Sequence, residues 1–268
     1  MQGFDDDLVR FEAEGPAPLP AGGITGYVEH DNARIWYGSY GAGPPVILLH
    51  GGMGNAGNWG FQVPALVAAG YTAIVVDSRG HGRSTRDDRP FTYQLLAGDV
   101  RAVMDRLRIP RAAFVGWSDG ACTALILGDS HPERVAGVLY FGCNMDASGT
   151  KPFVYTETIG RCLSRHKQDY AALSATPGDF DAVFDAVGLM QQTQPNYAPT
   201  DIARIHVPVT IVQAENDEFI THAHAEYLAR TLPDAELVDL SEVSHFAPVQ
   251  RPEVFNRAML SFAGKVLR

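Results

Sequence analysis

The chain has 268 residues, of which 46% are hydrophobic and 19% are charged, a composition typical of a globular protein rather than a disordered one. Lys and Arg number 21 against 31 Asp and Glu, so the formal net charge is −10 and nucleic acid is not an expected partner. No apolar run reaches the roughly 18 residues of a membrane span, and residues 1–7 lack the basic and apolar stretches of a signal peptide. We therefore expect a cytoplasmic protein with no membrane partner.

The pattern of apolar segments along the chain predicts an α/β protein. After a polar leader over residues 1–23, residues 26–30 and 34–40 are typical of an antiparallel hairpin. Short apolar runs predict buried strands over 45–50, 72–77, 112–116, 135–141, 207–213 and 235–240. Helical periodicity fills most of the intervals, for example 93–107 and 121–127. This alternation predicts a mostly parallel sheet with crossover helices on both faces.

One interval, residues 144–202, carries no strong strand pattern and is interrupted by several prolines. A structureless loop of that length is rare in a compact domain, so we expect a small helical lid. The predicted organisation is a leader at 1–23, a core formed by 24–143 and 203–268, and the lid at 144–202.

The cysteines Cys122, Cys143 and Cys162 are odd in number and not closely paired. This argues against a disulfide framework and against a cysteine-rich metal site. We expect each of them to be a small buried apolar side chain. No metal and no cofactor is predicted.

The pentapeptide Gly116-Trp117-Ser118-Asp119-Gly120 lies between a predicted strand and a predicted helix. A strand, a sharp turn and a helix are what hold a nucleophilic serine in a strained, exposed position, with glycines where the turn leaves no room for a Cβ atom. Ser118 is therefore the predicted nucleophile.

A serine hydroxyl needs a base, and the base needs a carboxylate that fixes its tautomer. His245 follows a late strand, in the loop where this arrangement delivers a base. Asp217 lies just past the strand before it, with Glu215 and Glu218 as rivals, and its distance from the strand end favours it. The catalytic residues are then Ser118, Asp217 and His245, in that chain order.

A tetrahedral intermediate also needs donors for its oxyanion. The glycine-rich turn around Gly51 to Gly54 follows the third predicted strand, and we assign one backbone donor to Gly52, with Met53 as the alternative. The second donor is the amide of Asp119, which directly follows the nucleophile.

Taken together, these motifs over about residues 26–266 resemble the α/β-hydrolase superfamily. The segment from Asp77 to Ser84 is similar to the family's turn after its fourth strand, and we expect a structural role for it. The residues around Ser118 resemble the branch of biphenyl hydrolase-like proteins, the valacyclovirases, which implies the cleavage of amino-acid esters.

The side chain of Asp119 has two interpretations. It could bind the α-ammonium group of a substrate, which would favour amino esters. It could instead hydrogen-bond nearby backbone and support the turn.

The predicted function is hydrolysis of a small carboxylic ester through an acyl-enzyme intermediate. A meta-cleavage C–C hydrolase or a lactonase on the same scaffold is the enzymatic alternative, and a non-catalytic ligand receptor of the same fold is the alternative from another class. The expected partner is a small-molecule ester, and the sequence predicts no oligomeric state.

Overall fold

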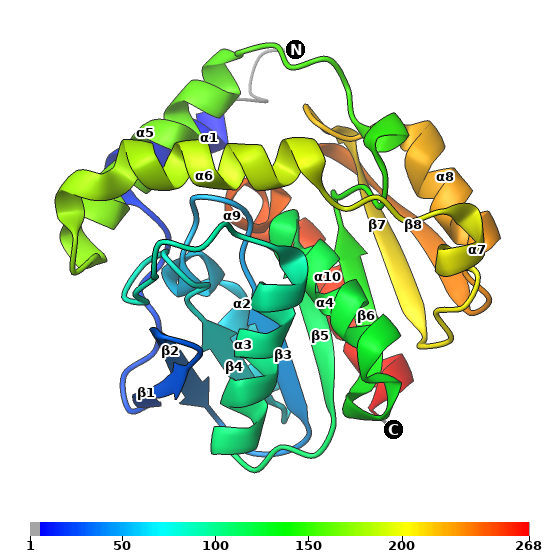
Figure 1. Ribbon diagram of the computed structural model, residues 1–268, viewed down its shortest axis with the longest axis horizontal. Coiled ribbons are helices and arrows are strands. Elements are labelled where there is room, and N and C mark those ends of the chain that lie inside the picture. The colour runs from blue at the N-terminus through cyan, green and yellow to red at the C-terminus, as the bar shows by residue number, and fades with distance from the viewer. Residues whose placement is uncertain (1–5, 268) are drawn as a thin grey trace.

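Eight strands form one sheet, in the order β1-β2-β4-β3-β5-β6-β7-β8, in the computed structural model, which describes residues 6–267 (Figure 1). The strands are β1 Ile24–His30, β2 Ala33–Tyr40, β3 Pro45–Leu49, β4 Thr72–Val76, β5 Ala112–Trp117, β6 Val135–Phe141, β7 Val209–Asn216 and β8 Ala235–Ser244. The α-helices are α1 Asp6–Glu14, α2 Gln62–Ala68, α3 Tyr93–Arg106, α4 Asp119–Ser130, α5 Glu157–Leu173, α6 Phe180–Thr193, α7 Pro199–Ile202, α8 His222–Thr231, α9 Ala247–Gln250 and α10 Pro252–Val266. Short 3₁₀ helices cover Ala56–Trp59, Pro132–Arg134, Ala147–Gly149 and Pro177–Asp179.

The sheet is parallel from β4 across to β8, and the predicted hairpin β1–β2 joins it through an antiparallel pairing of β2 with β4. Asp31 and Asn32 form the hairpin turn with φ values of 48° and 64°, a left-handed conformation that these two residue types tolerate. The predicted α/β fold with a mostly parallel sheet is confirmed. Strand ends differ from the prediction by a few residues, most at β8, which continues to Ser244.

The core lies in two layers, one on each face of the sheet. Side chains of β3 and β5 alternate between them, so Ile47 and Phe114 pack with α3 and α4, whereas Leu48 and Val115 pack with α2 and α10. Because both faces are covered, these strands are apolar throughout instead of alternating with polar residues. The carboxyl ends of the central strands are thereby held rigidly, and the loops that follow them carry the site.

The segment 144–202 contains α5, α6 and α7 and no strand of the sheet. In Figure 1, α5 and α6 lie together at one end of the sheet. Helix α1, which the sequence pattern did not predict, packs against α5, and its Leu8 and Phe11 are buried. Two apolar residues three positions apart in an acidic segment are too weak a pattern to predict a helix, and the contact with α5 stabilises it instead.

The expectation of three unpaired cysteines was wrong for two of them, because Cys122 and Cys143 form a disulfide. Cys122 lies in the first turn after β5 and Cys143 lies just after β6. Since these two strands are parallel neighbours, their carboxyl ends meet and bring the Cα atoms to 6.4 Å, although 21 residues separate them in sequence. Disulfides are uncommon in reducing compartments, so the cytoplasmic location stays a prediction.

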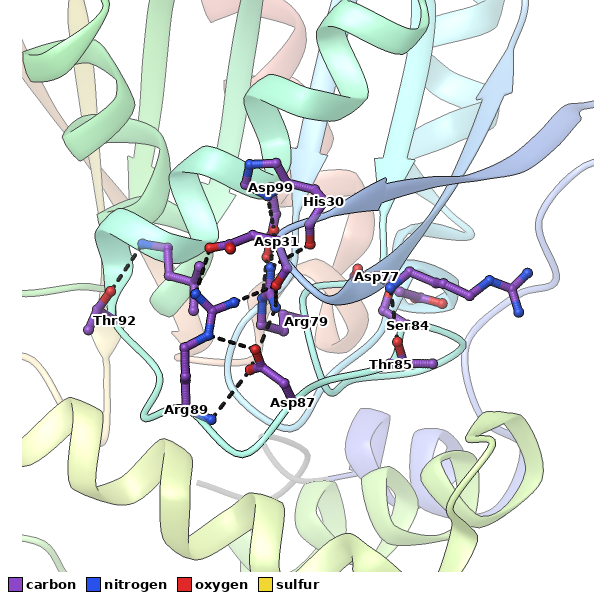
Figure 2. A network of polar contacts seen from close by, with 12 residues as sticks. His30, Asp31, Asp77, Arg79, Ser84, Thr85, Asp87, Arg89, Thr92 and Asp99 are labelled. Carbon is purple, nitrogen blue, oxygen red and sulfur yellow. Dashed lines mark hydrogen bonds and ion pairs between the residues drawn. The ribbon is translucent and has the colours of Figure 1, made fainter.

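The loop after β4 is held by a network of polar contacts, shown in Figure 2. The Arg79 guanidinium is buried and donates to both carboxylate oxygens of Asp99, at 2.9 and 2.6 Å, and to the carbonyls of His30 and Asp31. Arg79 thus joins the loop, the β1–β2 turn and α3. These contacts support the structural role expected for the segment from Asp77 to Ser84.

Replacing Arg79 by alanine is expected to lower the free energy of unfolding by about 3–5 kcal/mol, because the buried Asp99 carboxylate loses its guanidinium. Urea unfolding followed by circular dichroism measures this change. Arg89→Ala is the matched control, since Arg89 binds Asp31 and Asp87 in the same network but is exposed, and we expect a much smaller effect. Equal losses in the two variants would contradict this account.

Candidate active site

Ser118 lies in the sharp turn between β5 and α4 with φ 54° and ψ −123°, a conformation that L-residues rarely adopt. The turn is tightly packed. A Cβ atom on Gly116 would lie 2.5 Å from the amide nitrogen of Ala121, and one on Gly120 would lie 2.1 Å from the carbonyl oxygen of Leu49. Glycine is therefore required on both sides of the serine, as the motif predicts, and the strain is maintained by the packing around it.

The side chains of His245 and Asp217 meet at the carboxyl ends of β7 and β8. Asp217 Oδ2 lies 3.0 Å from His245 Nδ1, and Asp217 Oδ1 accepts hydrogen bonds from the amides of Phe219 and Ile220, both at 2.9 Å. Both side chains are buried. The carboxylate is fixed by its backbone donors and can hold the imidazole with the Nδ1 proton toward it.

The electrostatics of this pair favour a charged carboxylate and a basic imidazole. Burial alone raises the pKa of Asp217, but the neighbouring His245 and the two backbone donors outweigh it, so the pKa lies below its usual value. Burial alone lowers the pKa of His245, but the Asp217 carboxylate outweighs it, with help from Glu218 and Asp119, so the pKa lies above its usual value. His245 therefore becomes protonated at a higher pH than an ordinary histidine.

The rival acids Glu215 and Glu218 accept hydrogen bonds from backbone amides, in β8 and directly after it respectively. Glu215 accepts from the amide of Glu242 at 2.7 Å, and Glu218 accepts from the amide of His245 at 2.9 Å. Of the three acids, Asp217 has the contact with the imidazole ring. The geometry favours Asp217 as the orienting acid.

Ser118 and His245 both line a cavity of about 430 Å³, which lies between the strand ends and the helices α5 and α6. Its other polar lining residues include Tyr93, Asp119, Asn144, Lys151, His166 and Gln191, and the rest of the wall is largely aromatic and aliphatic. Phe219 contacts the imidazole edge to face, with ring centroids 4.7 Å apart. The cavity thus brings the predicted nucleophile and base together in a mainly apolar enclosure of a size that holds a small organic molecule.

Gly52 and Met53 line the same cavity, next to the nucleophile. A Cβ atom on the preceding Gly51 would lie 3.1 Å from Ser118 Cβ, so this turn runs directly beside the serine. His50 holds the turn: its Nε2 accepts from the amide of Ser78 at 3.0 Å, which leaves the Nδ1 proton for the carbonyl of Gly51 at 2.7 Å. Burial lowers the pKa of His50 to about 4, so the ring stays neutral in this role.

The amide of Asp119 begins α4, where the first N–H groups have no partner within the helix. It is therefore a candidate donor for an oxyanion beside Ser118, and the amide of Gly52, which lines the same cavity, is the other candidate. Met53, the alternative to Gly52 as a backbone donor, has φ 64° and also lines the cavity. The geometry therefore leaves the amides of Gly52 and Met53 both as candidates.

The Asp119 carboxylate binds two side chains from other helices, and not the nearby backbone that one of its two interpretations expected. Its Oδ1 accepts from the hydroxyl of Tyr93 at 2.7 Å, and its Oδ2 accepts from Nε2 of Gln191 at 3.0 Å. Tyr93 begins α3 and Gln191 lies on α6, so the carboxylate connects the core to the helical segment above it. Burial raises the pKa of Asp119, which is 7% exposed.

No sequence pattern indicated that Tyr93 and Gln191 belong to the site. Neither belongs to a motif, and Gln191 lies in the segment whose sequence pattern is weakest. The hydroxyl of Tyr93 stays protonated, because burial and the nearby Asp119 carboxylate raise its pKa well above the usual value. Both side chains therefore act as neutral donors to Asp119.

The fold and the site define a class of protein. A model of the α/β-hydrolase fold family matches residues 44–150. The solved structure of Est816, described as an N-acyl homoserine lactone degrading enzyme, is 30% identical, with a TM-score of 0.70 over 88% of this chain and all of that one. The chain belongs to the α/β-hydrolase family.

Individual relatives agree with this assignment over nearly their whole length. The chain is 27% identical to RutD of Azorhizobium caulinodans, over 90% of this chain and 98% of that protein. It is 24% identical to the serine hydrolase BPHL of Mus musculus, over 94% of this chain and 90% of that protein, which agrees with the branch that the residues around Ser118 resemble. The protein is a hydrolytic enzyme, so the receptor alternative is set aside. Across residues 6–267, no helix has the length and apolarity to cross a membrane.

Proposed function

We propose that the protein hydrolyses small carboxylic esters through an acyl-enzyme intermediate, without a cofactor. The observation that carries this proposal is the combination of a strained serine and a buried histidine that line one cavity with a carboxylate oxygen 3.0 Å from the histidine ring.

In the proposed reaction, Ser118 Oγ attacks the ester carbonyl while His245 Nε2 accepts the serine proton. The amides of Gly52 and Asp119 stabilise the oxyanion, and the protonated His245 donates its proton to the departing alkoxide. In the second half of the reaction, His245 takes a proton from a water molecule as its oxygen attacks the acyl carbonyl. The bond between the acyl carbon and Ser118 Oγ then breaks, His245 returns the proton to Oγ, and the acid leaves. Asp217 holds the imidazole and stabilises its charge in both halves of the reaction.

The helical segment 144–202 acts, in this proposal, as a lid on the core formed by 24–143 and 203–268. Its contribution to the cavity supports this role, since α5 supplies Leu163 and His166, and α6 supplies Phe184, Val187 and Gln191. These side chains exclude water from one side of the cavity, which strengthens the electrostatic interactions at the reacting atoms.

We further propose that Asp119 gives the enzyme a preference for α-amino esters. The carboxylate is buried beside the nucleophile, and within residues 6–267 its hydrogen bonds come from two neutral donors and no ion pair involves it. Each oxygen keeps a lone pair for a further donor. A substrate ammonium group would supply the missing positive charge and place the ester carbonyl next to Ser118.

Asp119→Asn is expected to lower kcat/KM for phenylalanine methyl ester by about 10- to 100-fold, because the variant keeps the shape of the side chain and loses its charge. Methyl 3-phenylpropanoate, which lacks only the amino group, is the control substrate and should change by about threefold or less. Steady-state kinetics on the two esters measures the effect. A similar loss on both would mean that Asp119 supports the turn and does not select the substrate.

The pH dependence gives the same proposal a second test. Because burial raises the pKa of Asp119, its carboxylate becomes protonated at a higher pH than an ordinary aspartate as the solution is acidified. The ratio of kcat/KM for the amino ester to that for the neutral ester should therefore fall toward acid pH. Both substrates need neutral His245 to the same extent, so the effect of protonating His245 cancels in this ratio.

Lactone hydrolysis is a second candidate function, favoured by the likeness to Est816. A lactone is a cyclic ester, so its hydrolysis needs the same nucleophile, base and oxyanion donors. The shape and lining of the cavity then determine which of the two substrates binds. A panel of p-nitrophenyl esters, amino-acid esters and N-acyl homoserine lactones ranks the two by kcat/KM. Cleavage of lactones alone would replace the ester proposal.

A further inference from the structure

Lys151 contributes a positive charge to the cavity, on the side of the acid loop. Its Nζ donates to the carbonyl oxygen of Asp217 at 2.6 Å. The protein has three lysines, and Lys167 and Lys265 each pair with a carboxylate, with Asp181 and Glu236 respectively. Within residues 6–267, Lys151 is the lysine for which no carboxylate lies within ion-pair distance.

The backbone around Lys151 is also fixed. Its amide donates to the carbonyl of Phe219 at 2.7 Å, and the preceding Thr150 forms a β-bridge with Ile220. Both the backbone amide and the ammonium group of Lys151 are thus bound to the loop that carries Asp217. An ammonium has three donors, and the Asp217 carbonyl uses one of them, which leaves two for a ligand in the cavity.

The negative charge of Asp119 and the positive charge of Lys151 lie on different sides of the cavity. The buried carboxylate of Asp119 lies beneath Gly52, where a Cβ atom would meet its Oδ2 at 2.7 Å, on the side of the oxyanion turn. Lys151 lies with Asp217 and Phe219, on the side of the acid loop. Much of the cavity's lining is apolar, with Trp117, Phe153 and Phe219 among its members.

We propose that Lys151 is a subsite for a carboxylate group of the substrate, so that the enzyme acts on esters that carry a negative charge away from the scissile bond. This rests on the proposed ester hydrolysis and specifies its substrate class. Lys151 is exposed at the cavity wall, and a substrate carboxylate would give its ammonium the ion pair that no carboxylate of residues 6–267 provides. The net charge of −10 would otherwise disfavour an anionic ligand.

The test compares substrates of similar length with and without a carboxylate. Monomethyl glutarate carries it on the acyl side, and the butanoyl ester of glycolic acid carries it on the alcohol side. Methyl hexanoate and ethyl butanoate are their neutral counterparts. The quantity of interest is the ratio of kcat/KM for an anionic ester to that for its neutral counterpart.

For at least one of the two pairs, Lys151→Gln should lower this ratio by about fivefold or more, and Lys151→Glu should lower it further, because the second variant reverses the charge. Lys151→Arg should keep the ratio within about twofold of the wild type, since it retains the charge. Lys167→Gln, which removes an exposed lysine outside the cavity, should leave the ratio unchanged.

An unchanged ratio in all Lys151 variants for both pairs would overturn the proposal. So would an equal loss on anionic and neutral esters, which would assign Lys151 to holding the Asp217 carbonyl. Failure of ester hydrolysis itself is a separate result, because the wild-type enzyme would then turn over neither p-nitrophenyl acetate nor any of the four esters.

Discussion

Replacing Ser118 by alanine is expected to lower kcat for p-nitrophenyl acetate by about 10⁵- to 10⁶-fold, the size of loss that follows removal of a nucleophile that works together with its base. The reason is that no acyl-enzyme can form without Oγ, and only the oxyanion donors and the binding of the substrate remain. Stopped-flow and steady-state absorbance at the wavelength of p-nitrophenolate measure both the initial burst and the turnover.

The control is Ser130→Ala, which removes a serine from the other end of α4 and should leave kcat unchanged. Circular dichroism must show that both variants are folded. Turnover by Ser118→Ala above about one per cent of the wild type, in protein free of contaminating esterase, would show that another residue attacks the ester.

Asp217→Asn should lower kcat by about 10⁴-fold, because the asparagine amide can donate to Nδ1 and so fix the wrong imidazole tautomer. It should also change the pH profile. The reaction needs neutral His245, and the Asp217 carboxylate raises the pKa of the imidazole, so in the wild type activity is lost as the pH falls through this raised value. Removing the carboxylate lowers the pKa of His245, and the acid limb of kcat/KM should move to lower pH.

Glu215→Gln is the matched control for this prediction. Glu215 lies two residues before Asp217 but binds the amide of Glu242 in β8 instead of the imidazole, so its loss should leave the position of the acid limb unchanged. If Asp217→Asn left the acid limb in place, or if Glu215→Gln moved it as far, the assignment of Asp217 as the orienting acid would be wrong.

The sequence predicted those structural elements that a short, continuous stretch of residues defines by itself. The buried strands are continuous apolar runs, and the turn at Ser118 needs glycines that are visible in the pentapeptide. The three candidate acids could be ranked but not separated by sequence, because all of them lie at the same strand end. Only the fold shows that Glu215 and Glu218 bind backbone amides in and directly after β8, while Asp217 binds the imidazole ring.

The features that were missed depend on contacts between distant parts of the chain. Helix α1 is stabilised by α5, although Glu157 at the start of α5 lies 143 positions after Glu14 at the end of α1. The disulfide depends on the adjacency of β5 and β6. Gln191 reaches Asp119 across 72 residues, and Lys151 reaches Asp217 across 66. No periodicity or motif contains these pairings, because they follow from how the helical segment lies on the core.

The most direct test of the central claim, that His245 activates Ser118 as the nucleophile, is the mass of the protein after reaction with a fluorophosphonate ester. The wild-type protein should gain one phosphonyl group on the tryptic peptide between Arg111 and Arg134, at Ser118, and Ser118→Ala should gain none. His245→Ala should be labelled at least about a hundredfold more slowly. Labelling at another residue, or at an equal rate without His245, would contradict the account.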